Sequence, residues 1–354
     1  MKEYKKFTFD KNCSQFIKAL SILMMLMHHF WGYPDWLYNG NKCAGIFGGD
    51  IPVEMCLAGF FKLCVAFFAF VTGYGMFFVM QKEHYLKKVI KKAYGILVTY
   101  WLIIFLVYLP AYFLINRSAT AEYISAKEII LGMFGISNKI NRFSWYIYFY
   151  LLAIFTLPVY KRIMSKNQIL ALCGALIPFK AAIFIINHGS FDIPRLFLNC
   201  INNYLNYMSV ILIGYIFAKY NTFDTLSHFL YRLRLDKAVT YALIIFVIFI
   251  FRDIIGGAIF GTNIDAVYTP FLILALGKMS KKINNMHIVD FLARHSLNFW
   301  LLHGIFFPQS NGLTFLQNLV YFPRIPILIV VWAIVLMLPV SVMLKKICRI
   351  LHAD

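Results

Sequence analysis

The sequence has 354 residues, of which 61% are apolar and only 14% are charged. An average soluble domain is roughly half apolar and a quarter charged, so this composition excludes a disordered chain and an ordinary cytosolic enzyme. The net charge of +19 does not indicate nucleic-acid binding, because the cations lie in short clusters between apolar segments. Membrane orientation and anionic lipid account for such clusters. The sequence therefore predicts a polytopic membrane protein.

Apolar stretches of about 20 residues, enough to cross a hydrocarbon core, recur along the whole chain. We predict an all-α transmembrane bundle of about ten helices, forming a single domain over residues 1–354. In chain order the predicted helices cover residues 14–33, 56–80, 93–115, 144–160, 168–187, 203–219, 238–256, 264–278, 295–309 and 325–344. No internal repeat stands out, which counts against the transporter folds that are built from inverted repeats.

The distribution of Lys and Arg between the loops predicts the orientation. The segments on the same side as the N-terminus hold 24 of the 34 Lys and Arg residues, and the opposite loops hold 8. Cytoplasmic loops carry the excess of cations, so both termini should be cytoplasmic. The composition, rich in Lys, Phe and Ile, fits a multi-pass protein of the bacterial cytoplasmic membrane. The first span lacks a small-residue cleavage site and is therefore predicted to be a retained anchor.

The first predicted span runs from Phe16 to Trp31 and has a cation near its inner end and two histidines near its outer end. Lys18 precedes His29 by eleven positions, which is three helical turns plus roughly 20°, so both lie on one face about 16 Å apart along the axis. His28 points to a neighbouring face. Two interpretations are open. Either these side chains mark the two membrane interfaces, or His29 is a neutral buried general base and Lys18 holds an anionic cofactor.

A second group of cations precedes the third predicted helix. Lys87, Lys88, Lys91 and Lys92 are neighbours on one helix end, at spacings of three and four residues. The excess of cations expected on the cytoplasmic side explains such a run by itself. The functional alternative is a binding site for the phosphates of a cofactor, because lysine acts as a point-charge phosphate ligand.

Several short motifs together resemble the acyltransferase-3 family of integral-membrane acyltransferases. The family has an arginine, ten residues and a histidine in its first helix, and this chain has Lys18 and His29 at that spacing. The segment from Val65 to Tyr74 resembles the Val-x-x-Phe-Phe-x-x-Ser-Gly motif, with threonine in place of serine. The remaining matches are the lysine run 87–92, Tyr100 and Trp101, Trp145 and Tyr146, Gly214 and Tyr215, and the segment from Ser296 to His303. The resemblance covers residues 15 to 345.

The resemblance implies an enzyme that transfers an acyl group, usually acetyl, from cytoplasmic acyl-CoA to a hydroxyl, typically on a sugar of a polysaccharide, a lipopolysaccharide or a lipid-linked glycan. Its implied catalytic residues are His29, as the general base, and Lys18. Acetyl-CoA is expected to bind at Lys18 and the lysine run. Four residues are candidates for substrate contacts, with a place at the interface or in the packed interior as the alternative: His28, Trp145, Tyr146 and His303. His28 is also a substitute candidate for the base, ranked below His29 because of its helix face.

Orientation of His29 requires a further group, because one ring nitrogen must hold the proton that the other lacks. Asp35, Asp50 and Glu54 are the nearest acids in sequence. On the outer side, five charged residues can contact a polar acceptor or can be solvated: Asp192, Arg195, Arg252, Asp253 and Asp265. No metal is expected, because the histidines and cysteines lack ligand spacing.

Two other functions remain open. Ten helices with the intramembrane cations Lys62 and Lys180 can line a permeation path, as in a transporter or flippase for a polar or lipid-linked glycan. A receptor or assembly factor without turnover is the third possibility. The expected partners of the leading interpretation are acyl-CoA, a glycan or lipid-linked sugar acceptor and membrane lipid, without nucleic acid.

Overall fold

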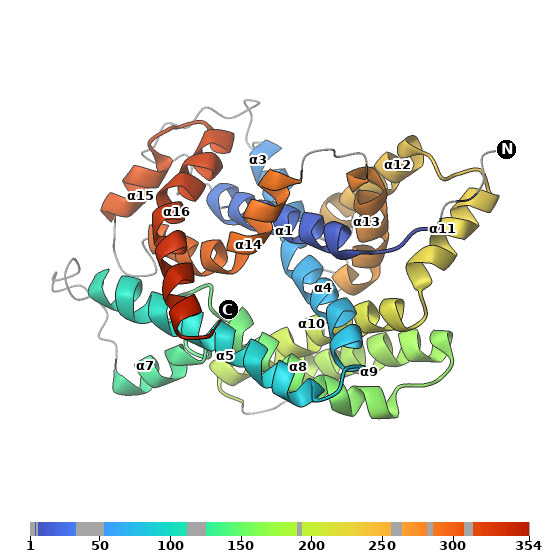
Figure 1. The fold of residues 1–354 in the computed structure, drawn as a ribbon, viewed down its shortest axis with the longest axis horizontal. Helices are drawn as coiled ribbons and strands as arrows, with labels where there is room; N and C mark the ends of the chain where they lie inside the picture. Colours follow the sequence, from blue (N-terminus) through green and yellow to red (C-terminus); the bar gives the residue numbers. More distant parts are fainter. Residues whose placement is uncertain are drawn as a thin grey trace.

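The computed structural model describes residues 4, 6–32, 53–111, 125–189, 193–255, 264–281, 286–307 and 314–353. Every regular element in these ranges is a helix (Figure 1), which confirms the all-α prediction there. The elements are α1 (Lys11–Trp31), α3 (Val53–Phe61), α4 (Cys64–Val79), α5 (Tyr85–Ile103), the π-helix η1 (Ile104–Tyr108), α7 (Ala126–Met133), α8 (Tyr146–Ile163), α9 (Gln168–His188), α10 (Arg195–Lys219), α11 (Thr222–Arg232), α12 (Ala238–Phe249), the π-helix η2 (Ile250–Ile255), α13 (Asp265–Ser280), α14 (His287–Leu302), the 3-10 helix η4 (His303–Phe306), α15 (Thr314–Tyr321) and α16 (Pro326–Ile350).

Each of the ten predicted segments coincides with a helix, but fewer are long and apolar enough to cross a membrane. Five helical stretches in the described residues meet both conditions, and a shorter apolar helix covers Ala238–Arg252. The five are Val53–Val79, Tyr85–Ala111, Gln168–His188, Arg195–Lys219 and Pro326–Ile350. Helices α13 and α14 have only 16 residues each, which is below the usual span of about 20. Ten crossings and cytoplasmic termini therefore stay predictions.

Helix α1 lies at the centre of the bundle, where it packs against α3, α4, α13, α14 and α16 (Figure 1). Asp10 caps its N-terminus by accepting a hydrogen bond from the backbone N–H of Cys13 at 2.8 Å. The chain before α1 is held in place as well, because Asp224 of α11 accepts hydrogen bonds from the Tyr4 hydroxyl and the Phe7 backbone. These contacts fix the position from which α1 presents its side chains.

Helices α4 and α10 pack closely because glycine occurs on both at their crossing. A Cβ atom at Gly73 would lie 1.9 Å from the carbonyl oxygen of Ile211, and one at Gly214 would lie 2.3 Å from that of Phe70. Glycine is thus required at Gly214, the position that resembles the family's Gly-Tyr pair. Helix α4 lines the cavity described below, and α10 packs against α4.

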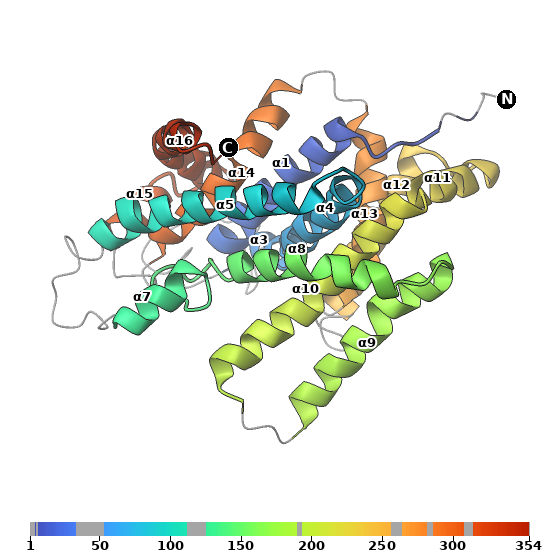
Figure 2. The same cartoon turned by 60° about the horizontal axis from the view of Figure 1, so that its bottom comes forward.

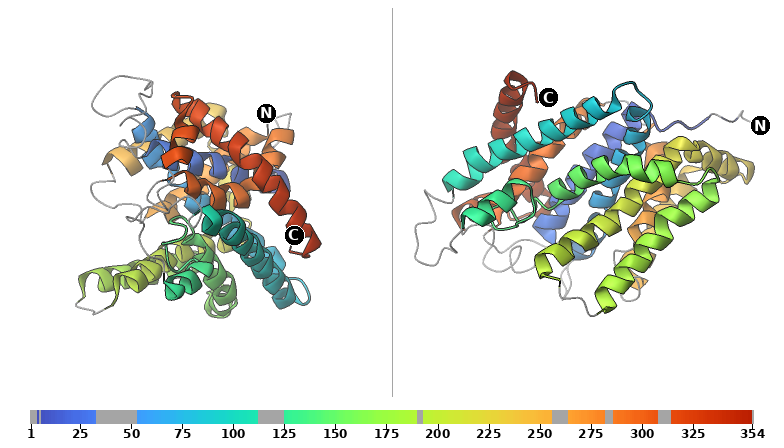
Figure 3. Two further views of the ribbon diagram at one scale, coloured as in Figure 1. Left: turned by 90° about the vertical axis from the view of Figure 1, so that its left-hand side faces the viewer. Right: turned by 90° about the horizontal axis from the view of Figure 1, so that it is seen from below.

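Helix α9 lies at the edge of the molecule and packs mainly on α10 (Figures 2 and 3). It exposes large apolar side chains along its length, among them Ile169, Ile177 and Phe184 at 71%, 62% and 63%. A helix apolar on its exposed faces is stable in lipid and not in water. This surface is therefore suited to the hydrocarbon core of a membrane.

Candidate active site

A cavity of about 350 Å³ lies between α1, α4, α5, α8 and α14. Lys18 and His29 both line it, as their spacing on one helix face predicts. Lys18 is half-buried and makes no hydrogen bond or ion pair with the described part of the chain. The structure thus brings the two residues of the first-helix motif to one internal space, and their chemical roles stay predictions.

Aromatic rings enclose His29. The centroid of its ring lies 4.3 Å from that of Phe143, 4.7 Å from that of His28 and 4.9 Å from that of His303. Its Nδ1 atom is buried and has no hydrogen-bond partner within the described residues. The side chain keeps partial accessibility because it lines the cavity, which leaves Nε2 as the nitrogen that can face a ligand.

His28 and His303 are not among the residues that line this cavity. The Nδ1 atom of His28 hydrogen-bonds the carbonyl oxygen of Ala58 at 2.7 Å, which ties α1 to α3. His303 is completely buried, and its Nδ1 atom hydrogen-bonds the carbonyl oxygen of Trp300 one turn earlier. Both therefore contact the protein rather than the cavity.

Trp145 and Tyr146, the two other candidates for substrate contact, do line the cavity. The ring of Tyr146 packs edge-to-face on Trp300, with 5.4 Å between the centroids. Its hydroxyl is buried without a hydrogen-bond partner in the described chain. A buried orphan hydroxyl costs free energy unless something binds it. Tyr146 is thus a candidate donor to a ligand.

Among the other hydroxyls that line the cavity, two donate to their own helix. Thr72 donates to the carbonyl oxygen of Phe68 at 2.8 Å, and Ser296 donates to that of Ala293 at 2.9 Å. Their oxygens can still accept a hydrogen bond. Tyr150, which also lines the cavity, was missed by sequence analysis, although its spacing of four residues from Tyr146 places both on one helix face.

A second cavity of about 550 Å³ adjoins the first, because four residues line both: Lys92, Ile96, Tyr150 and Leu297. Six cationic side chains and no acidic one are among its lining residues. These are Lys82, Lys88, Lys91, Lys92, Arg294 and Lys345. Lysines 88, 91 and 92 were predicted, whereas Lys87 is exposed and lies outside both cavities. Arg294 and Lys345 come from distant parts of the sequence, where no motif marked either residue as a candidate ligand for the cofactor.

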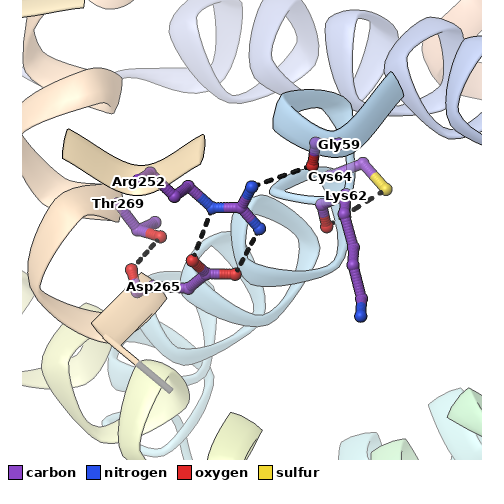
Figure 4. A network of polar contacts seen from close by, with 6 residues as sticks. All are labelled: Gly59, Lys62, Cys64, Arg252, Asp265 and Thr269. Carbon is purple, nitrogen blue, oxygen red and sulfur yellow. Dashed lines mark hydrogen bonds and ion pairs between the residues drawn. The ribbon is translucent and has the colours of Figure 1, made fainter. Parts of the chain in front are cut away.

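Arg252 and Asp265 form a buried ion pair, so of the two alternatives left open for them, solvation is wrong (Figure 4). Arg252 Nε donates to Asp265 Oδ1 at 2.8 Å and Nη2 donates to Oδ2 at 3.2 Å, with the residues 5% and 3% exposed. Nη1 donates to the carbonyl oxygen of Gly59 at 2.8 Å. The guanidinium thus ties η2 to α13 and α3 and does not line either cavity.

The acids considered as partners of His29 do not line the cavity with it in the described part of the chain. Glu54 is completely buried on α3, while positions 35 and 50 lie outside the described residues. No acidic residue is among those that line the first cavity. The neighbours that surround His29 in the described chain are aromatic rings.

Comparison with sequence families identifies the chain. The model of the acyltransferase domain of the acyltransferase-3 family matches residues 12–346. The chain belongs to this family. No curated protein and no solved structure matches it. Membership of the acyltransferase-3 family, together with the apolar helices, shows a membrane acyltransferase, and the resemblance of the short motifs is confirmed.

Proposed function

We propose that this acyltransferase-3 protein moves an acyl group, acetyl by preference, from cytoplasmic acyl-CoA to a hydroxyl of a cell-surface or exported glycan, with His29 as the general base. The observation that carries the proposal is the pair of adjoining cavities. One holds His29 and Lys18, and the other holds six cations. A thioester on a long, phosphate-bearing carrier requires this combination.

The second cavity fits the charged part of CoA. Its lysines and arginine are suited to phosphate oxygens, since lysine is a point-charge ligand and arginine offers a planar fork of donors. Lys92 and Tyr150 line both cavities, so a ligand held there can extend its acyl-bearing arm toward His29. Together the two volumes lie in the range of pockets for organic ligands.

The proposed reaction is a direct transfer. His29 Nε2 takes the proton of the acceptor hydroxyl, whose oxygen attacks the thioester carbonyl and forms a tetrahedral oxyanion. The C–S bond then breaks, and the proton passes from His29 to the departing sulfur of CoA. Tyr146, with its unpartnered hydroxyl, is the donor that we propose for the oxyanion. Lys18 supplies positive charge on the same side as the carrier.

The acceptor class and the location are proposed from what the family resemblance implies and from the predicted orientation. His29 is near the outer end of α1 in that orientation, so a hydroxyl can reach it from the side opposite to acyl-CoA. The proposed location is the bacterial cytoplasmic membrane. A transporter without acyl transfer is disfavoured, because the family is one of acyltransferases.

The test compares wild type, Lys18→Ala and His29→Ala, purified in detergent, for acetyl-CoA binding and slow hydrolysis. We expect His29→Ala to bind acetyl-CoA but to lose at least about 100-fold in turnover, since a general base contributes roughly 10²- to 10⁴-fold. Lys18→Ala should weaken binding about 10-fold, as expected for a charge-assisted contact. Retained turnover in His29→Ala would contradict the assignment of the base. A folded wild type with neither binding nor turnover would contradict the acyl-CoA donor.

A further inference from the structure

His303 is held rigidly at the point where α14 ends and η4 begins. The carbonyl oxygen of Leu301 accepts hydrogen bonds from the Tyr108 hydroxyl at 3.0 Å and from Asn141 Nδ2 at 3.1 Å. A Cβ atom at Gly304 would lie 2.6 Å from the Tyr108 hydroxyl and 2.9 Å from Asn141 Oδ1, so no larger residue fits the turn. Three separate segments therefore meet at His303, which lies outside the substrate cavity.

The hydrogen bond at Nδ1 decides the protonation of His303. Its partner is the carbonyl oxygen of Trp300, which can only accept, so Nδ1 carries the hydrogen. Nε2 of the neutral ring is then an acceptor. That atom is buried and has no partner in the described chain, and leaving a buried acceptor unsatisfied is costly.

His29 requires the opposite partner, an acceptor for a hydrogen on its Nδ1 atom. If Nε2 of His29 takes a proton from the acceptor, Nδ1 must already carry one, because a neutral imidazole has one donor and one acceptor. Nδ1 is buried and also lacks a partner in the described residues. The rings of His29 and His303 are stacked, with centroids 4.9 Å apart and an interplanar angle of 28°. One orphan donor and one orphan acceptor thus lie on adjacent rings.

The other neighbours of His29 are less suitable partners. Phe143 and Phe307, at 4.3 and 6.3 Å between centroids, have no acceptor. His28 also uses its Nδ1 on a carbonyl, that of Ala58, but it has no nitrogen among the buried orphan atoms of the described chain. His303 is therefore the neighbour whose own unmet hydrogen bond matches that of His29.

We propose that His303 is the positioning residue for His29, whose Nδ1–H it accepts at Nε2. The proposed link is one shared water, because stacked rings do not point an N–H of one at a nitrogen of the other. The bond holds Nε2 of His29 deprotonated toward the acceptor. It strengthens when His29 becomes positively charged during transfer. This inference rests on the proposed role of His29 as the base.

The role predicts an effect on turnover rather than on binding, because the bond is strongest in the transition state. We compare His303→Phe, which keeps a stacked ring without an acceptor, with His303→Gln, whose amide oxygen reaches the position of Nε2. We expect His303→Phe to lower kcat roughly 10- to 100-fold, with KM for acetyl-CoA within about twofold. His303→Gln should recover most of the loss. If the His303 ring only packs, His303→Phe should have a higher kcat than His303→Gln.

Controls separate this role from structural ones. His295→Gln changes another buried histidine of α14, which bonds Ser341 at 2.7 Å, and should leave kcat within about twofold. If His303→Phe does not fold, the comparison of His303→Gln with His303→Asn decides, because the oxygen of the shorter amide does not reach the position of Nε2. Equal rates for the Gln, Asn and Phe variants of His303 would overturn the proposal. It would also be overturned if Phe lowered kcat and Gln restored it at His28 but not at His303. An active His29→Ala variant would contradict the proposed function, and with it this inference. An inactive His29→Ala variant together with His303 variants that match wild type would contradict this inference alone.

Discussion

Lys18, Lys87 and Lys91 show how equivalent side chains acquire different environments. All three are lysines at predicted cytoplasmic helix ends, yet Lys18 lines the first cavity, Lys91 lines the second and Lys87 lines neither. Lys87 and Lys91 are one helical turn apart and both are exposed at the surface of α5. Position along the helix, not charge, therefore separates a candidate ligand for phosphate from a cation that only marks the membrane interface.

This pair gives a matched test. We expect Lys91→Ala to raise the Kd for acetyl-CoA roughly 3- to 10-fold, since a contact between an exposed lysine and phosphate contributes about 1 kcal/mol. Lys87→Ala removes the same charge outside the cavity and should leave Kd unchanged. The Kd is measured by isothermal titration calorimetry at low salt, where electrostatic interactions at the surface are strongest. Equal effects of the two substitutions would show that only the overall charge matters.

At the scale of elements, the break between α3 and α4 is built into the fold. The helices end and restart around Lys62 and Leu63, and carbonyl groups before the break receive side-chain donors. Ala58 is bonded by His28 of α1, and Gly59 by Arg252 of η2. Backbone groups freed within a membrane protein must be satisfied by neighbouring elements. The break is thus held from two sides, directly before Cys64, which lines the first cavity.

The buried pair of Arg252 and Asp265 should control the stability of this region (Figure 4). Arg252→Met leaves a buried carboxylate without its cation, which typically costs about 3–5 kcal/mol. We expect a lower thermal midpoint in detergent. The double variant Arg252→Met, Asp265→Leu should be more stable than Arg252→Met, because no uncompensated charge remains. A single variant as stable as wild type would contradict this account.

At the scale of the molecule, cations from separate predicted inner segments meet at one place. Lys82, Arg294 and Lys345 come from the segment before α5, from α14 and from the C-terminal helix α16, and all line the second cavity. The loop-charge rule assigned each of these segments to the cytoplasm. A common location for all three is what a cytoplasmic site for acyl-CoA requires.

The orientation itself is open to a direct measurement. We expect epitope tags at both termini to be inaccessible to antibody and protease in intact cells, and to become accessible once the cytoplasmic membrane is opened. A tag placed within residues 190–192, a predicted outer loop, serves as the control and should be accessible from outside. Accessibility of both termini in sealed cells would reverse the topology and place the second cavity on the outer face. Accessibility of only one terminus would contradict the even number of crossings.

Much of the architecture could be read directly from the sequence, because the relevant signals are local. Helical periodicity alone puts Lys18 and His29 on one face of α1, and apolar runs locate ten helical segments. Short motifs in the right order were enough to indicate the family. Length and hydropathy did not establish ten crossings, since α13 and α14 are too short for a full span on their own.

Contacts between distant segments were decided only by the tertiary structure. The stacking of His303 on His29, the Arg252–Asp265 pair and the meeting of Arg294 with Lys345 each join residues that are far apart or separated by turns. No periodicity within one helix encodes how another helix packs against it, because the crossing depends on close approaches such as those of Gly73 and Gly214. The sequence by itself determined the helices, the family and the first-helix face, whereas packing determined which side chains share a cavity.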